Sequence, residues 1–338
     1  MRLYRLPKFD SIDDLMLGEA ESPRPARGQV AVRMRATSLN YRDLMVVGGR
    51  YGRGTARANL VPLSDGAGEV TAIGPDVTRF KVGDRVAGIF MQTWIAGEIE
   101  AANGASAMGG GIDGVLTEER VFEEEGLVHL PAHLSFEEGA TLPCAAVTAW
   151  NALYGLKPVQ AGQTVLVLGT GGVSIFGLQF AHAAGARVIA TSSSDAKLEK
   201  AKALGASAGI NYKAVPEWQD QVRELTGGRG VDHVVEVGGA GTLPRSIQAT
   251  RMAGLIHIIG GLTGASGEIN PSSIIRGNVV LRGVYVGSRE LFEAMNRAIA
   301  FHKLKPVIDR VFPFKDAKAA YRHLQSQTHL GKVVIKVD

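Results

Sequence analysis

A glycine cluster lies between two apolar runs in residues 165–177 (VLVLGTGGVSIFG), and its spacing is suited to binding a ligand. An apolar strand followed by glycines and a helix is the setting of a dinucleotide fingerprint, in which the helix N-terminus holds a pyrophosphate. Gly169 permits the tight turn, Gly171 removes a Cβ that would block the pyrophosphate, and Gly172 begins the helix. The residues predicted to contact the cofactor here are Gly169, Thr170, Gly171, Gly172 and Val173.

The fingerprint is incomplete in one position. Ser174 stands where the third glycine of GxGxxG is expected, and Gly177 comes three residues late. The competing interpretation is a tight strand-to-helix turn that binds nothing. The further strand and helix units behind this turn favour cofactor binding.

The end of the next strand decides which dinucleotide is expected. An NAD site usually carries a carboxylate there, whereas this chain has the hydroxyls of Thr191, Ser192, Ser193 and Ser194, with Lys197 nearby. Hydroxyls, a helix N-terminus and a cation would accept a 2′-phosphate, so NADPH is favoured over NADH. The alternative is that Ser194 only caps the following helix, and Asp195 in its first turn speaks for NADH.

From about residue 160 strands alternate with helices, which predicts βαβ units and a parallel sheet with helices on both faces. The predicted strands are residues 165–169, 187–192, 231–237, 255–260 and 279–287, and the predicted helices are residues 174–185, 195–205 and 243–254. The tail adds two helical patterns, 290–304 and 315–326, and a last strand, 332–337. Because the tail breaks the alternation, we expect it to pack on the N-terminal domain.

The N-terminal part has another rhythm. Up to about residue 125, short Val- and Ile-rich runs (29–36, 67–74, 83–90) alternate with turn residues, which predicts antiparallel strands in a barrel or sandwich. Residues 97–114 are rich in Gly, Ala and Ser without periodicity. They predict a long surface loop, either a binding segment or a disordered one.

Composition bounds the function classes. A length of 338 residues favours two domains, since single cores usually stop growing near ~250–300 residues. The net charge of +4 comes without a block of like charges, so we expect neither nucleic acid nor a membrane as partner. One cysteine, Cys144, excludes an intramolecular disulfide and fits a reducing cytoplasm. The charged N-terminus with its proline does not have the form of a signal peptide.

With these residues in view, the chain resembles the medium-chain dehydrogenase/reductase superfamily, and most its zinc-free quinone oxidoreductase and enone reductase branches. The resemblance runs over almost the whole length and rests on the order of seven motifs: SLNYRDLMVVGGRYG (38–52), PLSDGAGEV (62–70), KVGDRVAG (81–88), LPCAAVTAWNAL (142–153), GTGGVS (169–174), KALGA (202–206) and GRGVDHVVEVGG (228–239). It implies an α/β fold with a GroES-like β-rich catalytic domain (1–125), a Rossmann doubly wound parallel-sheet domain (126–287) and a tail (288–338) that returns to the catalytic domain. It also implies an active site between the domains and a homodimer joined near residues 279–287.

The resemblance also implies functional residues. The catalytic cleft near the nicotinamide would be lined by Asn40, Tyr41, Asp43, Tyr51 and Ser64, with Asn40 and a tyrosine hydroxyl as donors to the substrate oxygen. The alternative for each is an ordinary polar residue of a loop. Further cofactor contacts would come from Thr148, Tyr212, Val237, Gly238, Gly260, Gly261, Val286 and Lys332, the last of them at the cofactor phosphates.

No metal is expected. The Cys, His and Cys ligands of zinc alcohol dehydrogenases fall on Asn40, Ser64 and Cys144, and Asp65 could add only one oxygen, short of the three ligands that catalytic zinc needs. Cys144 is expected to be a buried core thiol. His129 and His133 are four residues apart, but Pro131 between them disfavours a helical metal site.

The absence of zinc points to substrates that form a delocalised anion. A simple ketone becomes a localised alkoxide, which usually needs a metal, whereas a quinone or an enone becomes a phenolate or enolate that hydrogen bonds can stabilise. We therefore expect a zinc-independent, NADPH-dependent reductase of a conjugated carbonyl or quinone. The alternatives are an alcohol dehydrogenase for small alcohols or aldehydes, and a dinucleotide-binding protein without catalysis.

Overall fold

The computed structural model describes residues 1–51, 57–264 and 266–338, and the chain divides into two compact units. Unit 1 is Met1–Val147 with Gly287–Asp338, and unit 2 is Thr148–Val286. The boundary between the units, after Val147, thus lies beyond the expected domain boundary at residue 125. The reason is that strand β7 (Leu127–His129) pairs with β5 (Arg85–Gly88) in the sheet of unit 1.

Unit 2 is built on one six-stranded parallel sheet. Its strands lie in the order β10 (Ala208–Asn211), β9 (Arg187–Ser192), β8 (Thr164–Val167), β11 (Val231–Glu236), β12 (Thr250–Ile258) and β13 (Val280–Gly283). The chain starts in the middle at β8, runs to one edge, and returns to continue from β11 to the other edge. This is the strand order of dinucleotide-binding sheets, in which ligands bind outside the carboxyl ends of the strands where the order reverses.

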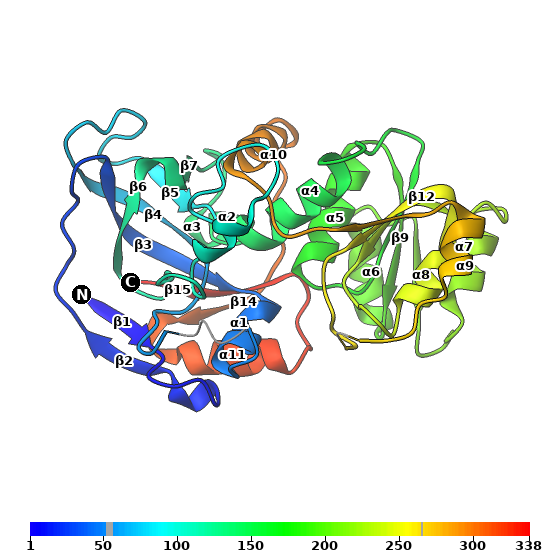
Figure 1. Ribbon diagram of the computed structural model, residues 1–338, viewed down its shortest axis with the longest axis horizontal. Helices are drawn as coiled ribbons and strands as arrows, with labels where there is room; N and C mark the ends of the chain where they lie inside the picture. Colours follow the sequence, from blue (N-terminus) through cyan, green and yellow to red (C-terminus); the bar gives the residue numbers. More distant parts are fainter. Residues whose placement is uncertain (52–56, 265) are drawn as a thin grey trace. The chain divides into compact units, whose positions relative to one another are not determined.

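Helices cover both faces of this sheet (Figure 1). Helices α5 (Gly172–Ala183) and α6 (Asp195–Ala203) lie on one face, and α7 (Trp218–Leu225), α8 (Leu243–Ala249) and α9 (Pro271–Gly277) on the other. Helix α4 (Val147–Tyr154) follows the π-helical turn η3 (Leu142–Ala146). The predicted alternation of strand and helix is therefore confirmed.

Two predicted elements of this unit were too long. The helix predicted over 243–254 ends at Ala249, because Thr250 already begins β12 and pairs with Val231 of β11. The last strand, predicted over 279–287, pairs only over Val280–Gly283. Val284 still donates its N–H to the backbone oxygen of Ile258 at 2.9 Å, but Val286 has a positive φ of 57° that a strand does not allow.

Unit 1 contains a seven-stranded sheet. The order is β14 (Ile308–Pro313), β15 (Lys332–Lys336), β3 (Gln29–Leu39), β4 (Asp65–Ile73), β5 and β7, and β6 (Glu119–Glu123) pairs with β3 off this path. β1 (Arg2–Arg5) and β2 (Met16–Glu19) form a separate pair. The helices of this unit are α1 (Tyr41–Val47), α2 (Ala101–Ala105), α3 (Phe136–Gly139), α10 (Arg289–His302) and α11 (Ala317–Gln325), with 3-10 turns at Ile12–Asp14, Glu124–Gly126 and Phe314–Asp316. The tail thus supplies strands to the N-terminal sheet.

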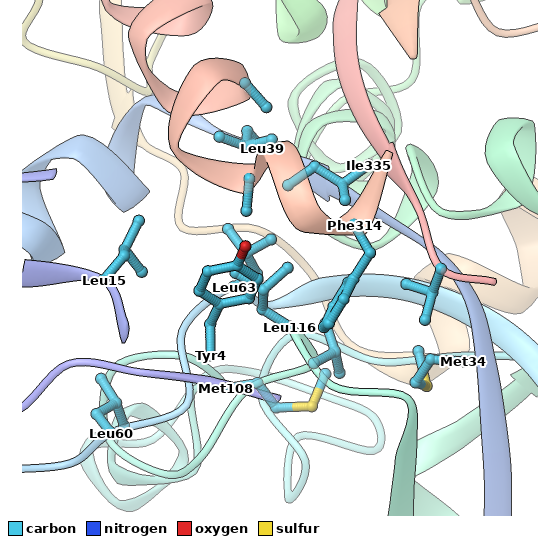
Figure 2. Packing of buried hydrophobic residues seen from close by; sticks show 14 of the residues in the cluster. Tyr4, Leu15, Met34, Leu39, Leu60, Leu63, Met108, Leu116, Phe314 and Ile335 are labelled. Carbon is cyan, nitrogen blue, oxygen red and sulfur yellow. The ribbon is translucent and has the colours of Figure 1, made fainter. Parts of the chain in front are cut away.

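The apolar core of unit 1 collects residues from both ends of the chain. Figure 2 shows Tyr4 beside Phe314, whose rings meet edge to face at 5.3 Å, together with Met34, Leu39 and Ile335. Leu39 and Leu63, both in this core, immediately precede Asn40 and Ser64 in the sequence. The core therefore anchors the backbone on which two of the candidate site residues stand.

The loop predicted over 97–114 is not simply a surface loop. It contains α2, and Met108 is fully buried in the core of unit 1 (Figure 2). The backbone of Met108 also pairs with Phe90, and Ala107 forms a bridge with Met91. Because Ala107 and Met108 are buried, this part of the segment is packed into the domain rather than disordered. In the part of the chain that the structure describes, no helix has the length and apolar character to cross a bilayer.

Candidate functional site

Three adjacent strands of unit 1 bring together the central polar residues of the candidate site. β15 pairs with β3 so that Val333 lies opposite Leu39, which places Lys332 beside Asn40. β3 pairs with β4 so that Ser38 lies opposite Asp65. Asn40, Asp65 and Lys332, which are up to 292 residues apart in the sequence, therefore meet at one end of the sheet.

The ammonium of Lys332 is the centre of this cluster. Its Nζ donates to the backbone oxygen of Leu39 at 2.7 Å and to Oδ1 of Asn40 at 2.5 Å, and lies 3.6 Å from Oδ2 of Asp65. Lys332 is only 2% exposed. The glycine before it is required, because Gly331 has a φ of 73° and a Cβ there would lie 2.3 Å from the carbonyl oxygen of Val307.

Ser64, Asp65 and Cys144 form the neighbouring part of the cluster. The hydroxyl of Ser64 donates to Oδ1 of Asp65 at 2.7 Å, and the backbone N–H of Cys144 donates to Oδ2 at 3.2 Å. Ser64 and Asp65 are fully buried, whereas Cys144 as a whole residue is partly exposed. Burial, reinforced by the charge of Asp65, raises the pKa of the Cys144 thiol, which disfavours the thiolate.

Asp43 lies one helical turn from Asn40. Its Oδ2 accepts the backbone N–H of Asn40 at 2.7 Å, which fixes the start of α1. Its Oδ1 has no hydrogen-bond partner among the described residues, and the guanidinium of Arg42 lies 3.6 Å away. Burial raises the pKa of Asp43 to about 6, against the opposing effects of Arg42 and the Asn40 N–H. This carboxyl group can therefore hold or release a proton near neutral pH.

Arg42 is a site residue that the sequence analysis missed. Its guanidinium donates to the backbone oxygens of Met108 (2.7 Å) and Gly109 (3.2 Å) and stacks on Tyr51, 4.2 Å from the ring centroid. It thus ties α1 to the segment after α2. A sequence signal existed, because Arg42 and buried Val46 are four residues apart and share one face of α1.

The two candidate tyrosines lie differently. Tyr51 is half-buried under the guanidinium of Arg42, and the motif residue that follows it, Gly52, lies outside the described residues. Tyr41 is 38% exposed and lines a surface cavity of about 450 Å³ with Leu44 and Val47. Asn40 and Asp43 do not line this cavity. Tyr321 of α11, also missed, is fully buried, and burial and the charge of Asp43 raise the pKa of its hydroxyl.

The residues present do not fit a zinc site. Among the described residues, no group of three or more His, Cys, Asp or Glu side chains is close enough to hold a metal ion. Asp65 and Cys144 are adjacent, but the oxygens of Asp65 already face Ser64, the Cys144 N–H and the Lys332 ammonium. A second cation at this place would be repelled by that ammonium. His129 and His133 bond to separate carbonyl oxygens, of Arg79 and Leu304.

In unit 2 the glycine cluster forms a turn suited to an anion. β8 leads into α5, whose N-cap is Gly171, and Gly169 has a φ of 73°. A Cβ on Gly171 would meet no protein atom within 4 Å, so the space over this helix N-terminus is open. The backbone N–H of Gly169 donates to the hydroxyl of Thr191 at 3.2 Å, which ties the turn to the end of β9.

The missing third glycine is accounted for by Ser174 and Gly177. The hydroxyl of buried Ser174 donates to the backbone oxygen of Leu168 at 2.6 Å, inside the turn. Gly177 faces the sheet, where a Cβ would lie 3.4 Å from Val235 and 3.6 Å from Val167. Gly177 therefore has the helix-to-strand packing role that the third glycine has in the fingerprint.

The hydroxyls at the end of β9 make local hydrogen bonds. The Oγ of Ser192 accepts the N–H of Ser194, and the Oγ of Ser194 accepts the N–H of Lys197 as the N-cap of α6. Both hydroxyls act as acceptors in these bonds, so their O–H groups can still donate to a phosphate. Asp195, the one nearby carboxylate, accepts from Nδ2 of Asn211 at 2.8 Å, a partner that was not foreseen.

The other predicted cofactor residues are spread over both units. Val237, Gly238, Gly260 and Gly261 lie after β11 and β12, and the first loop is held by buried Glu236, which accepts from the N–H of Gly238 and Gly239 and from Thr242. Thr148 is buried in α4, and the carbonyl of Val286 accepts from Asn151 of the same helix at 2.7 Å. Tyr212 is 41% exposed at the end of β10, while Lys332 lies in unit 1.

Comparison with known proteins matches two parts of the chain to two family models. A family model described as an alcohol dehydrogenase GroES-like domain matches residues 26–132, and one described as a zinc-binding dehydrogenase matches residues 172–301. A zinc-type alcohol dehydrogenase-like protein of Schizosaccharomyces pombe is 46% identical over 338 residues, covering 98% of this chain and 97% of the relative. The predicted fold class, a GroES-like domain with a Rossmann-like parallel-sheet domain, is confirmed.

Two solved structures are similar over their full length. An NAD-dependent alcohol dehydrogenase superposes with a TM-score of 0.91 at 33% identity, covering 100% of both chains. A quinone oxidoreductase of Pseudomonas syringae superposes with a TM-score of 0.83 at 28% identity, covering 99% of both chains. The names of the more similar proteins favour alcohol dehydrogenase, the alternative, over the quinone and enone reductases expected first.

Proposed function

Because the chain belongs to the medium-chain dehydrogenase/reductase superfamily, in its zinc-type alcohol dehydrogenase family, and is thus an NAD(P)-dependent oxidoreductase, we propose that it reduces conjugated carbonyl compounds without zinc. The substrate class is an enone or a quinone, and NADPH is the preferred cofactor. Bound at the glycine turn of unit 2, the dinucleotide supplies a hydride for the electron-poor carbon of the substrate.

One observation carries this proposal: an ammonium group lies among the positions that the zinc ligands would occupy. Asn40 and Ser64 replace two of the three ligands, and Lys332 donates to Asn40 and faces Asp65. The cluster thus offers hydrogen-bond donors and a fixed positive charge in place of a Lewis acid. Such donors are enough for an enolate or phenolate, whose charge is spread over several atoms.

Each residue of the cluster has a defined task in this proposal. Asn40 donates from Nδ2, which is buried and has no partner among the described residues, to the substrate oxygen. Asp43, with its pKa raised to about 6, exchanges the proton that the reduced substrate finally gains. Ser64 and the Cys144 N–H hold Asp65, which in turn balances the charge of Lys332.

The preference for NADPH rests on the end of β9. Ser192 and Ser194 keep O–H groups that can donate to a 2′-phosphate, and the N-terminus of α6 favours an anion there. Asp195 is engaged by Asn211, which draws the carboxylate toward β10. The similar NAD-dependent structure supports NADH as the competing cofactor.

A second candidate function is alcohol dehydrogenase, which the names of the relatives favour. It would require zinc held by Cys144 and Asp65 with a third ligand that the described residues do not supply. The distinguishing property is metal content, because a zinc alcohol dehydrogenase loses turnover when zinc is removed and regains it on addition.

The test begins with metal-stripped protein, its zinc content measured by mass spectrometry. NADPH and NADH are titrated separately, and oxidation is followed after addition of an enone, a quinone or a simple aldehyde. Turnover of the enone or quinone by the zinc-free protein is the expected result. Turnover of the aldehyde alone, restored only by stoichiometric zinc, would establish the second candidate instead. Cys144→Ser serves as the matched variant, since it removes the one thiol ligand and should leave zinc-free turnover intact.

A further inference from the structure

We infer that Lys332 is a positioning residue: its ammonium fixes the side-chain amide of Asn40 so that the NH2 group faces the substrate oxygen. This inference rests on the proposed function and gives Lys332 a different task from the predicted one at the cofactor phosphates. It requires only contacts within unit 1.

The ammonium makes two hydrogen bonds and one ion pair, all with groups of unit 1. An ammonium has three N–H groups and no acceptor. The oxygens near Nζ are also three: the Leu39 carbonyl at 2.7 Å, Oδ1 of Asn40 at 2.5 Å and Oδ2 of Asp65 at 3.6 Å. With the side chain only 2% exposed, these three oxygens hold the ammonium in one place. A cofactor phosphate would have to displace one of them.

The same contact decides which way the Asn40 amide points. The two ends of an amide have the same shape, so their orientation follows from hydrogen bonding alone. The ammonium can only donate, so it selects the oxygen of Asn40 and turns Nδ2 to the other side. There Nδ2 is buried and has no partner among the described residues. An unpartnered buried donor is costly, and a ligand oxygen would remove that cost.

Two carboxyl groups lie near the ammonium. The negative charge of Asp65 faces it directly, and Asp43 lies one turn along α1, with its Oδ2 on the Asn40 N–H. The positive charge also polarises the amide that it holds, which strengthens the Nδ2 donor. The hydrogen bond from Nδ2 to the substrate oxygen therefore strengthens as negative charge develops on that oxygen in the transition state.

The test uses a double-mutant cycle in the full-length protein. The variants are Lys332→Gln, Asn40→Ala and the pair together, with exposed Lys336→Met of the same strand as the matched control. If Lys332 acts through Asn40, each single variant lowers kcat about 100-fold, as loss of one oxyanion donor typically does, and the pair loses little more. The dissociation constant of NADPH should change less than about twofold in all of them.

Two results would overturn the inference. Losses that multiply in the pair would mean that Lys332 acts independently of Asn40. A rise of about tenfold or more in the NADPH dissociation constant of Lys332→Gln, growing with falling salt, would assign the ammonium to the cofactor phosphates. Lys332→Gln leaves the carboxylate of Asp65 without its cation, which by itself could disturb the site. The effect of Lys332→Gln on kcat and on the NADPH dissociation constant is therefore also measured in the Asp65→Asn background, with Asp65→Asn alone as the reference.

A readout without turnover separates this inference from the proposed function. In protein labelled with 15N-asparagine, the side-chain amide signals of Asn40 are those that Asn40→Ala lacks. They should shift in Lys332→Gln and stay in place in Lys336→Met. Unchanged signals refute the inference whatever the activity, whereas a wild-type protein that reduces no acceptor but shows the shift refutes only the proposed function.

Discussion

His233 of β11 and His257 of β12 form a direct hydrogen bond of 3.1 Å between Nδ1 and Nε2 inside the sheet of unit 2. Nε2 of His233 lies 3.2 Å from Oε1 of Gln163 and donates to it, so its Nδ1 must accept from His257. Both rings are buried, and burial lowers the pKa of His233 to about 4 and that of His257 to about 3. The pair is therefore neutral in the folded protein.

This histidine pair predicts a loss of stability in acid. The unfolded chain binds protons below pH 6.5, whereas the folded chain resists them down to about pH 4, so the free energy of unfolding falls as pH is lowered between these values. For His233 alone the effect is about 3 kcal/mol. His233→Gln should flatten this acid slope in urea titrations, and exposed His302→Gln should leave it unchanged. An equal slope in both variants would contradict the prediction.

For Asp43 we predict that the free energy of unfolding changes with pH in the opposite direction. Its pKa is raised from 3.8 to about 6, so its contribution to stability is present below about pH 4 and is lost as pH rises through 6. Asp43→Asn removes this loss, which amounts to about 3 kcal/mol. Between pH 4 and pH 6 the wild type loses the contribution of Asp43, and the variant has no such loss. The free energy of unfolding of the variant should therefore increase relative to that of the wild type over this range. A parallel profile would mean that Asp43 titrates at its ordinary value.

Gly171→Val should abolish cofactor binding without unfolding the protein. The φ of Gly171 is −76° and a Cβ there meets no protein atom within 4 Å, so the side chain enters only the space assigned to the pyrophosphate. We expect the NADPH dissociation constant to rise at least about 100-fold, or ~3 kcal/mol, with an almost unchanged melting temperature. Gly177→Ala is the control on the same helix, since its Cβ would face the sheet. Unchanged affinity in Gly171→Val would refute the fingerprint.

Ser192→Asp should shift cofactor preference toward NADH. The new carboxylate can still accept the Ser194 N–H, but it would repel a 2′-phosphate. We expect the affinity for NADPH to fall about tenfold or more, and that for NADH to change little. Ser192→Ala, which removes the hydroxyl without adding charge, separates repulsion from the loss of a hydrogen bond. If NADPH binds the aspartate variant as before, the 2′-phosphate lies elsewhere.

Much of unit 2 was predictable because its signals are local. The glycine turn before α5, the cap at Ser194 and the alternation of strand and helix each depend on residues close in the chain. The helix predicted over 243–254 failed where a non-local force took over, since pairing with β11 draws Thr250 into a strand. Pairing between distant strands overrides the preference of a short segment.

For the candidate site, the sequence was enough to identify the residue types that take part and to show that Cys144 is the one cysteine. The partners of these residues followed only from the folded arrangement. Strand register set Lys332 against Asn40, burial raised the pKa of Asp43, and Arg42 reached a loop 66 residues further on. The physical reason is that hydrogen bonds and burial depend on distances across the sheet, and no local pattern in the sequence encodes which strand ends will meet.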